Sequence, residues 1–480
     1  MAEKPTLQPH VLIFPLPLQG PVNCMLKVAE LFCLAGFHVT FLNTDHVHRR
    51  LLRHSHLHSR FAPFPTFRFK TVSDGLPEDH PRSGDRLMDI FDALEAVTKP
   101  LFRGMLISGV FSSEAGVPVT CIIADGAFDF ALDAAKEVGI PLIYFDTISP
   151  CCVWVHLCIP KLIESGELPF KGNDLDTPIT SVPGMEGFLR RRDLPIYCRA
   201  GDVSIPVVQI ILAEDRQLPK AHGLILNTFE EIEGPILSHI RSLCPNLYSI
   251  GPLQERLKIR LAEETTSPPA SSNGLWEEDG GCMTWLDAQP LRSVIYVSFG
   301  SLAVTRTADL KEFWHGLVNS GKRFLWVIRD NGVAGEDGDR QIPAEFSDGR
   351  KEGGYIARWA PQEEVLAHPA VGGFLTHSGW NSTLESIVAG VPMLCWPYFF
   401  DQQVNSRFVS EVWKIGLDMK DLCDRVVIEK MVNDLMDVRR DELVCSAENM
   451  AMLAKRSVSE GGSSLCNLNR LIEDIRSMSV

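Results

Sequence analysis

The chain has 480 residues, enough for two domains of ordinary size, and its 45% apolar and 22% charged residues are typical of a globular protein. A formal net charge of −15 argues against a nucleic-acid partner and against an anionic membrane surface. The thirteen cysteines show no metal-type C-x-x-C spacing, and no apolar run is long enough to cross a bilayer. We therefore expect a cytoplasmic protein with reduced thiols, no integral membrane segment and no nucleic-acid partner.

The first half alternates strands with helical stretches. A strand at His10–Phe14 leads through a Pro-rich loop into an amphipathic helix over Val22–Ala35, and a second strand follows at His38–Leu42. Repetition of such units predicts a parallel sheet. Further strands are predicted at Phe67–Val72, Cys121–Asp125, Pro141–Phe145, Gly223–Asn227 and Leu247–Gly251.

Ligands of open parallel sheets bind beyond the carboxyl ends of the strands. The residues just past those ends are therefore candidates to contact a substrate: Gln19, Pro21, Asp125, Asp146 and Thr147. The apolar helix that follows contains His156, and either core packing or the lining of an acceptor pocket would explain its composition.

Residues 252–281 have the composition of a linker, with Pro268-Pro269 and a mixed charge run. The alternation then restarts with a strand at Ser293–Phe299, a helix at Ala308–Ser320 and a strand at Arg323–Arg329. Ser301 follows the end of the first of these strands, so we expect it to face a diphosphate.

The most informative stretch runs from Trp359 to Gln402. Within it, an apolar strand delivers His377 onto a Ser-Gly turn, and a helix begins at Trp380. A glycine turn before a helix N-terminus offers free N–H groups and a positive dipole end to an anion. Asn381 and Ser382 add donors, His377 adds a donor or a charge, and the carboxylate of Glu385, one turn later, suits ribose hydroxyls. No metal is needed to bind a diphosphate in this way.

This stretch resembles the 44-residue signature box of the plant secondary-metabolite UDP-glycosyltransferases of family 1, which are inverting enzymes. The resemblance implies that Trp359 stacks on uracil and that a closing Gln accompanies glucose as the donor sugar. It also implies the remaining donor-site residues: Ala360 and Gln362 for uridine, Glu385 for ribose, His377, Trp380, Asn381, Ser382 and Ser301 around the diphosphate, and Asp401 and Gln402 for the sugar.

The same resemblance covers nearly the whole chain and implies the α/β GT-B fold, in which two Rossmann-like, doubly wound parallel-sheet domains face each other across a cleft. The predicted division is an acceptor-binding domain at 1–251, the linker at 252–281, a UDP-sugar-binding domain at 282–458 and a C-terminal helix at 459–480 that packs back on the first domain.

One departure affects the chemistry. Family members usually have a histidine after Gln19-Gly20 that serves as general base, and here Pro21 stands in its place. Asp125 matches the aspartate that orients that histidine, whereas Asp146 stands where the family often has Trp. The expected base is then a carboxylate, first that of Asp125. Asp146 and His156 are weaker candidates. Alternatively, the acceptor is an ionised carboxylic acid, which needs no base and gives a glucose ester.

Two further motifs are judged unrelated to function. Gly316 to Lys322 imitates a P-loop, but its glycines follow a helix instead of a strand and Arg323 replaces the magnesium-binding hydroxyl. The pairs Asp174/Asp176 and Asp337/Asp339 imitate a metal-binding motif, yet no strand precedes either.

The sequence thus predicts a monomeric, metal-independent, inverting transferase that moves glucose from UDP-glucose to a small apolar acceptor. The segment LPLQGPVN resembles glucosyltransferases of iridoids and cucurbit triterpenoids, which implies a terpenoid acceptor and a β-glucoside product. The alternatives are formation of a glucose ester and a catalytically silent sugar-nucleotide-binding protein.

Overall fold

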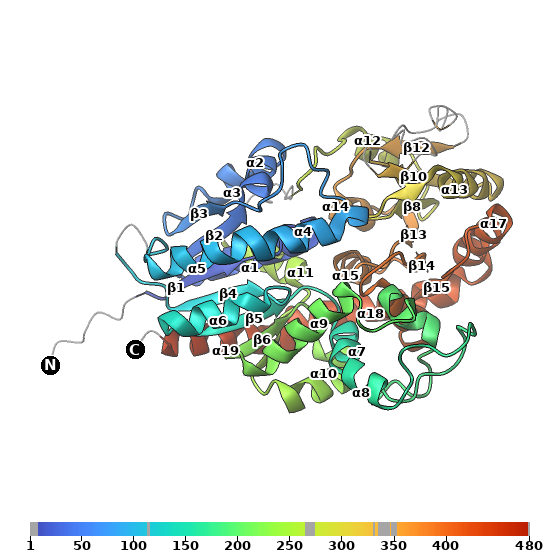
Figure 1. Ribbon diagram of the computed structural model, residues 1–480. Coiled ribbons are helices and arrows are strands. Elements are labelled where there is room, and N and C mark those ends of the chain that lie inside the picture. The colour runs from blue at the N-terminus through green and yellow to red at the C-terminus, as the bar shows by residue number, and fades with distance from the viewer. Residues whose placement is uncertain are drawn as a thin grey trace.

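A computed structural model describes residues 8–112, 116–264, 274–329, 332–334, 346 and 353–478. Two parallel sheets lie side by side, the first built from the N-terminal half of the chain and the second from the C-terminal half (Figure 1). Their strand orders are β3-β2-β1-β4-β5-β6-β7 and β12-β10-β8-β13-β14-β15. In both sheets the order reverses beside the first strand, between β1 and β4 and between β8 and β13. Ligand sites of doubly wound sheets form at such points.

The strands of the first sheet are β1 (His10–Phe14), β2 (His38–Thr44), β3 (Phe67–Val72), β4 (Cys121–Asp125), β5 (Leu142–Asp146), β6 (Gly223–Leu226) and β7 (Leu247–Ser249). Those of the second sheet are β8 (Val294–Ser298), β10 (Arg323–Val327), β12 (Gly354–Ala357), β13 (Val371–Thr376), β14 (Met393–Cys395) and β15 (Gly416–Asp418), and β9 (Thr305–Arg306) pairs with β11 (Val333–Ala334) beside them.

The helices of the first half are α1 (Gln19–Leu34), α2 (Asp45–His54), α3 (Leu57–Phe61), α4 (Leu87–Ala93), α5 (Lys99–Ile107), α6 (Asp129–Val138), α7 (Pro150–Leu157), α8 (Ile159–Glu164), α9 (Pro206–Gln217), α10 (Glu230–Leu243) and α11 (Leu253–Glu264). Those of the second half are α12 (Gly281–Asp287), α13 (Thr307–Asn319), α14 (Gln362–Ala367), α15 (Trp380–Ala389), α16 (Gln402–Arg407), α17 (Arg425–Asn433), α18 (Arg440–Val458) and α19 (Ser463–Ser477).

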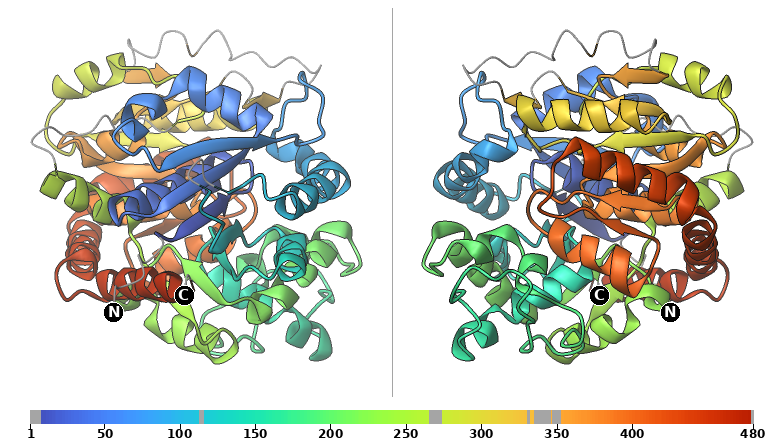
Figure 2. Two further views of the ribbon diagram at one scale, coloured as in Figure 1. Left: turned by 90° about the vertical axis from the view of Figure 1, so that its left-hand side faces the viewer. Right: turned by 90° about the vertical axis from the view of Figure 1, so that its right-hand side faces the viewer.

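Both faces of the first sheet are covered at its centre, which is why the central strands β1 and β4 are buried along their whole length. Every residue of β1 is buried, and successive side chains enter opposite cores: Val11 and Ile13 pack in the cluster that includes α1, and Leu12 and Phe14 in the cluster that includes α5 and α6. Helix α19 supplies side chains to the α1 cluster, and the Tyr248 hydroxyl of β7 donates to Asp474 at 2.7 Å. The chain's last helix therefore lies against the first half (Figure 2).

Direct contacts join the two halves. The Trp380 indole N–H donates to the carbonyl oxygen of Asn227 at 2.8 Å, and the buried ammonium of Lys420 lies 2.7 Å from Asp193. These pairs hold the carboxyl ends of the two sheets toward one another.

Most predicted strand ends lie within two residues of the observed ones, and two larger differences have a clear cause. Helix α1 begins at Gln19 instead of Val22, because a proline such as Pro21 is tolerated in the first helical turn, where no intrahelical N–H bond is required. The predicted linker contains helix α11, whose leucines Leu253 and Leu257 are buried. The linker composition arose from the prolines that follow this helix in the sequence. Among the described residues, no helix has both the length and the apolar character needed to cross a membrane.

Candidate active site

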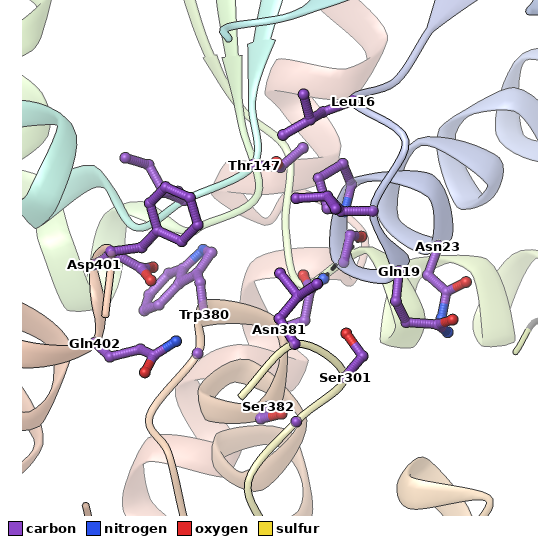
Figure 3. Close-up of a pocket in the computed structure, with 18 of the residues that line it drawn as sticks. Leu16, Gln19, Asn23, Thr147, Ser301, Trp380, Asn381, Ser382, Asp401 and Gln402 are labelled. Atoms are coloured by element: carbon purple, nitrogen blue, oxygen red, sulfur yellow. Dashed lines mark hydrogen bonds between the residues drawn. The ribbon is translucent and has the colours of Figure 1, made fainter. Parts of the chain in front are cut away.

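A cavity of about 290 Å³ lies where the carboxyl ends of the two sheets meet. It is lined from both halves: Gln19 and Asn23 of α1 lie on one side and Asp401 and Gln402 on the other, with the first turn of α15 below them (Figure 3). All the predicted donor-site, acceptor-site and catalytic residues line this one cavity.

The phosphate end of the cavity is built on β13 and α15. Ser378 has a φ of 63°, which turns the chain sharply, and the helix N-cap Gly379 has no side chain that would block the N–H groups of the first turn. The His377 ring fits between two glycines, since a Cβ at Gly300 or Gly379 would lie 2.4 or 2.5 Å from its Nε2 atom. Glycine is therefore required at positions 300 and 379, and the two glycine backbones hold the imidazole ring between them.

His377 was expected to offer either a hydrogen bond or a positive charge. Burial, with a contribution from the Arg329 guanidinium, lowers its pKa to about 4. The imidazole is therefore neutral at pH 7, and the positive end of the α15 dipole is the main attraction for an anion.

The ribose end is a hydrogen-bonded group of side chains. The Gln362 amide donates to the Ser382 hydroxyl at 2.8 Å and to the Glu385 carboxylate at 2.7 Å, and its carbonyl oxygen accepts from Tyr296 at 3.2 Å. Burial, and to a lesser degree the neighbouring Glu363, raises the pKa of Glu385 to about 7. The Gln362 amide thus orients Glu385, and the Ser382 hydroxyl helps to hold that amide in place.

The base end has an aromatic platform that the sequence did not reveal. Trp359 stacks against Trp276 with ring centroids 6.0 Å apart and planes at 30°, and the Arg50 guanidinium lies 4.1 Å from the Trp276 centroid. The carbonyl oxygen of Leu275 accepts from Arg50 at 2.8 Å. Trp276 and Arg50 come from outside the signature box, so no local pattern indicated them.

The sugar end contains Asp401 and Gln402. One carboxylate oxygen of Asp401 accepts from the Ser149 N–H at 3.2 Å and from the Asn405 amide at 2.8 Å, and burial raises the pKa of this carboxyl to about 6. The Gln402 carbonyl oxygen accepts from two backbone N–H groups, those of Tyr398 and Phe399, at 2.8 and 3.0 Å. Its amide nitrogen has no hydrogen-bond partner among the described residues and lines the cavity.

The first turn of α1 closes the cavity from the other half. The Gln19 side-chain oxygen (Oε1) accepts from the Leu275 N–H at 2.8 Å, and the Gly20 main-chain carbonyl oxygen accepts from the Asn381 amide at 3.0 Å. Pro21 lines the cavity between them without a proton-accepting atom. Two predicted site residues therefore also link the halves.

Two carboxyls lie at the ends of adjacent strands. Asp125 is 3% exposed and accepts from the Ala127 N–H at 3.1 Å and the Thr147 hydroxyl at 3.3 Å, and burial raises its pKa to about 6. Asp146 is partly exposed and accepts from Ile148 at 3.4 Å, and burial together with the Asp125 charge raises its pKa to about 7. Two groups that titrate near neutrality thus border the space beside Pro21.

The outer part of the cavity is apolar with an acidic strip. Its apolar residues are Leu16, Leu18, Phe91, Ile148, Val207, Ile211 and Leu218. Glu214 and Asp215 of α9 also line it, and each has one buried carboxyl oxygen without a hydrogen-bond partner among the described residues. Burial raises the pKa of both carboxyls well above the usual range. His156 lies in the wall, where it contacts the Tyr197 hydroxyl, and burial lowers its pKa to about 4.

The motifs set aside from the sequence have structural explanations. The glycines of Gly316 to Lys322 end α13 and precede β10, the reverse of a P-loop. Asp176 pairs with Arg190 at 3.0 Å, and Asp174 accepts from Asp176 in a turn. Asp337 and Asp339 lie outside the described residues. In the described ranges, no three His, Cys, Asp or Glu side chains form a metal-binding group.

Comparisons with known proteins agree with this geometry. The family model described as UDP-glucoronosyl and UDP-glucosyl transferase matches residues 277–451. The 7-deoxyloganetic acid glucosyltransferase of Catharanthus roseus is 58% identical over 99% of both chains, and the mogroside I-A1 synthase of Siraitia grosvenorii is 42% identical over 95% of this chain and 86% of that protein. The crystal structure of Os79 from O. sativa in complex with UDP has a TM-score of 0.79 at 28% identity, covering 97% of this chain and 100% of that chain.

The predicted GT-B fold and the predicted likeness to iridoid and cucurbit glucosyltransferases are both confirmed by these relatives. With 58% identity along almost the entire length of both chains, this protein belongs to the UDP-glucoronosyl and UDP-glucosyl transferase family and is a glycosyltransferase.

Proposed function

We propose that this enzyme transfers glucose from UDP-glucose to a hydroxyl group of a small terpenoid acceptor, with inversion and without a metal ion, as a cytoplasmic monomer. The observation that carries this proposal is the continuity of one cavity. At one end α15 presents its N-terminus to a diphosphate, and at the other an apolar wall suits a terpenoid skeleton. The two named relatives act on an iridoid acid and make a mogroside, which supports the same acceptor class.

The donor would lie along the second sheet. Uracil would stack on Trp359, the ribose hydroxyls would donate to Glu385, and the diphosphate would face the α15 N-terminus beside His377. The glucose would then reach Asp401 and the amide of Gln402. Gln402 presents a donor and Asp401 an acceptor at fixed positions. A sugar whose hydroxyls point in other directions would make these two hydrogen bonds less well, which would favour glucose over galactose.

Inversion requires a base on the side of the sugar opposite the leaving UDP. The acceptor hydroxyl gives its proton to a carboxylate as its oxygen bonds to the anomeric carbon, while the bond from that carbon to the β-phosphate oxygen breaks and its electron pair leaves with UDP. The α15 N-terminus and the neutral His377 stabilise the charge that develops on the phosphate.

We propose Asp146 as this base, with Asp125 as the group that raises its pKa. Asp125, ranked first from the sequence, is almost fully buried and has both carboxylate oxygens engaged. Asp146 is more exposed, and the loop after it contacts the sugar site, since the Ser149 N–H donates to Asp401. A base works best when its pKa lies near the working pH. His156 is the weaker candidate, because its ring contacts Tyr197.

Two carboxyls at the strand ends separate the hydroxyl route from the ester route. Asp125 and Asp146 border the acceptor space, and once they are ionised they would repel an ionised acid group held beside them, whereas Glu214 and Asp215 stay neutral near pH 7 because burial raises the pKa of each well above its usual range. This favours a hydroxyl as the attacking group. A carboxyl pair that titrates near neutrality also favours an active enzyme over a silent binding protein.

The test is incubation of the purified protein with UDP-glucose and a panel of iridoid and triterpenoid acceptors, followed by mass spectrometry and NMR of the anomeric proton. We expect a β-glucoside linked through a hydroxyl. An α-linked product, a glucose ester as the main product, or a preference for UDP-galactose would each contradict a stated part of the proposal. UDP binding without any transfer would favour the silent binding protein.

A further inference from the structure

Helix α1 reaches into the nucleotide site from the other half of the molecule. The Lys27 ammonium lies 2.7 Å from the Glu363 carboxylate, 336 positions later in the sequence, and the Lys27 side chain is 11% exposed. Glu363 directly follows Gln362, whose amide holds Glu385. Lys27 thus pairs with the residue next to Gln362, which orients the carboxylate of Glu385, the proposed ribose-binding group.

The same face of α1 touches the donor site twice. Gly20 and Lys27 are seven positions apart, so they lie on one side of the helix. Gly20 accepts from Asn381 at the phosphate end, and Lys27 pairs with Glu363 at the ribose end. Asn23, between them on this face, also lines the cavity (Figure 3). The helix therefore spans the length over which UDP would lie.

Lys27 supplies the positive charge that offsets two neighbouring carboxylates, Glu363 and Glu385. The ionisable groups that act on it are Glu363 of α14 and Lys27 of α1, while Cys24 of α1 and Tyr296 of β8 stay neutral near pH 7 because burial raises the pKa of each. Burial lowers the pKa of Lys27, but Glu363 and Glu385 outweigh this and raise it, so the ammonium keeps its charge. Among the described residues lining the cavity, Lys27 is the only lysine or arginine.

We propose that Lys27 is a positioning residue for the nucleotide: by neutralising Glu363 it keeps Glu385 a carboxylate that accepts hydrogen bonds from the ribose hydroxyls, and it makes donor binding depend on the position of α1. This inference rests on the proposed UDP-sugar donor. An ionised carboxylate accepts two hydroxyl hydrogen bonds, and such charge-assisted bonds are about twice as strong as neutral ones.

The experiment measures UDP affinity by calorimetry at pH 6.5 and pH 8.5 for wild type, Lys27→Met, Glu363→Gln and the double variant. Without Lys27 the pKa of Glu385 rises from about 7. We expect Lys27→Met to weaken UDP binding about tenfold at pH 6.5, which corresponds to a shift of about one pKa unit, and to recover most of the loss at pH 8.5. The double variant should bind within about threefold of wild type, because the charge that Lys27 offsets is gone.

Two controls separate this role from a purely structural one. Lys27→Arg keeps the charge and should bind UDP like wild type, and Lys430→Met, which removes an exposed lysine on α17, should change nothing. Thermal unfolding checks that each variant is folded. If Lys27→Met does not fold, Glu363→Gln alone tests the idea, since UDP binding should then persist to lower pH than in wild type.

An equal loss at both pH values, with no recovery in the double variant, would overturn the proposal, because it would mean that Lys27 contacts the nucleotide itself or only supports the fold. An unshifted pH dependence in Glu363→Gln would overturn it as well. A wild-type protein that does not bind UDP would instead contradict the proposed donor.

Discussion

Replacing Asp146 with Asn removes the proposed proton acceptor while it keeps the size of the side chain and the oxygen that accepts from Ile148. A general base contributes about 10² to 10⁴ in rate, which is about 3 to 5 kcal/mol of barrier. We expect Asp146→Asn to lower kcat on a hydroxyl acceptor by that factor. The variant's affinity for UDP should change less than about threefold, because the contacts of Asp146 with the described residues include none of the proposed uridine site.

Asp125→Asn is the matched variant, since it changes the neighbouring carboxyl. The base must be ionised, so the wild-type rate should fall as the pH drops through about 7, the pKa of Asp146. Burial raises this pKa and the charge of Asp125 raises it further, so removing that charge lowers it. Asp125→Asn should keep kcat within about tenfold and move the acidic limb of the pH profile to lower pH.

The assay is steady-state formation of the glucoside between pH 5.5 and pH 9, quantified by mass spectrometry at saturating UDP-glucose. The reasoning fails if Asp146→Asn stays within tenfold of wild type. If Asp125→Asn instead loses a hundredfold or more and Asp146→Asn retains activity, Asp125 is the base, as its position in the sequence suggested. If both variants remain active, His156→Gln is the next variant to measure.

The remaining predictions concern the donor, metal and stability. Trp359→Ala should weaken UDP binding ten- to a hundredfold by calorimetry, since stacking is worth about 1 to 3 kcal/mol, and unchanged affinity would remove Trp359 from the base site. Gln402→Ala should lower turnover with UDP-glucose more than it weakens UDP binding, whereas equal losses would exclude a contact with the sugar. EDTA should leave activity within about twofold, and a large loss restored by manganese would refute metal independence. Folding raises the pKa of Asp146 to about 7, so the folded state favours the neutral carboxyl. The free energy of unfolding therefore has its full value at low pH and decreases as the pH rises through 7, because the buried carboxyl then becomes charged. Asp146→Asn avoids this charge and should raise Tm more at pH 8 than at pH 5.5.

Much of the fold could be predicted because central strands such as β1 and β4 are short apolar runs, one followed by Pro15 and the other ending at Asp125. The predicted strands at His10–Phe14, Phe67–Val72 and Cys121–Asp125 coincide with β1, β3 and β4. The start of α1 was missed because Pro21 looked like a loop residue although it occupies the first helical turn.

The placement of His377, Asn381, Ser382 and Glu385 around one cavity could be predicted, because they follow one another along a single strand-turn-helix unit. Their roles toward a sugar nucleotide stay predictions. The contacts between the halves had no such signal. Lys27 and Glu363 lie 336 positions apart, and Ser149 and Asp401 lie 252 apart. Only the fold brings these pairs together. It also shows that the side-chain carbonyl oxygen of Gln402 accepts from two backbone N–H groups, while its amide nitrogen has no partner in the part of the chain that the structure describes.

The contact between Ser149 and Asp401 bears on how the enzyme works with proline at position 21. In an enzyme whose base is a histidine on the first loop, the base and the sugar-binding residues belong to separate halves, so their alignment depends on how the halves close. Here the loop that carries Asp146 is hydrogen-bonded through the Ser149 N–H to the carboxylate expected to hold the sugar. The proposed base and the sugar site therefore form one connected unit. With proline at position 21, α1 carries no proton acceptor there. The acceptor and the sugar are instead aligned by β5, which ends at Asp146, and by the start of α16, next to Asp401. Helix α1 keeps its contacts with the nucleotide end of the cavity through Gly20 and Lys27.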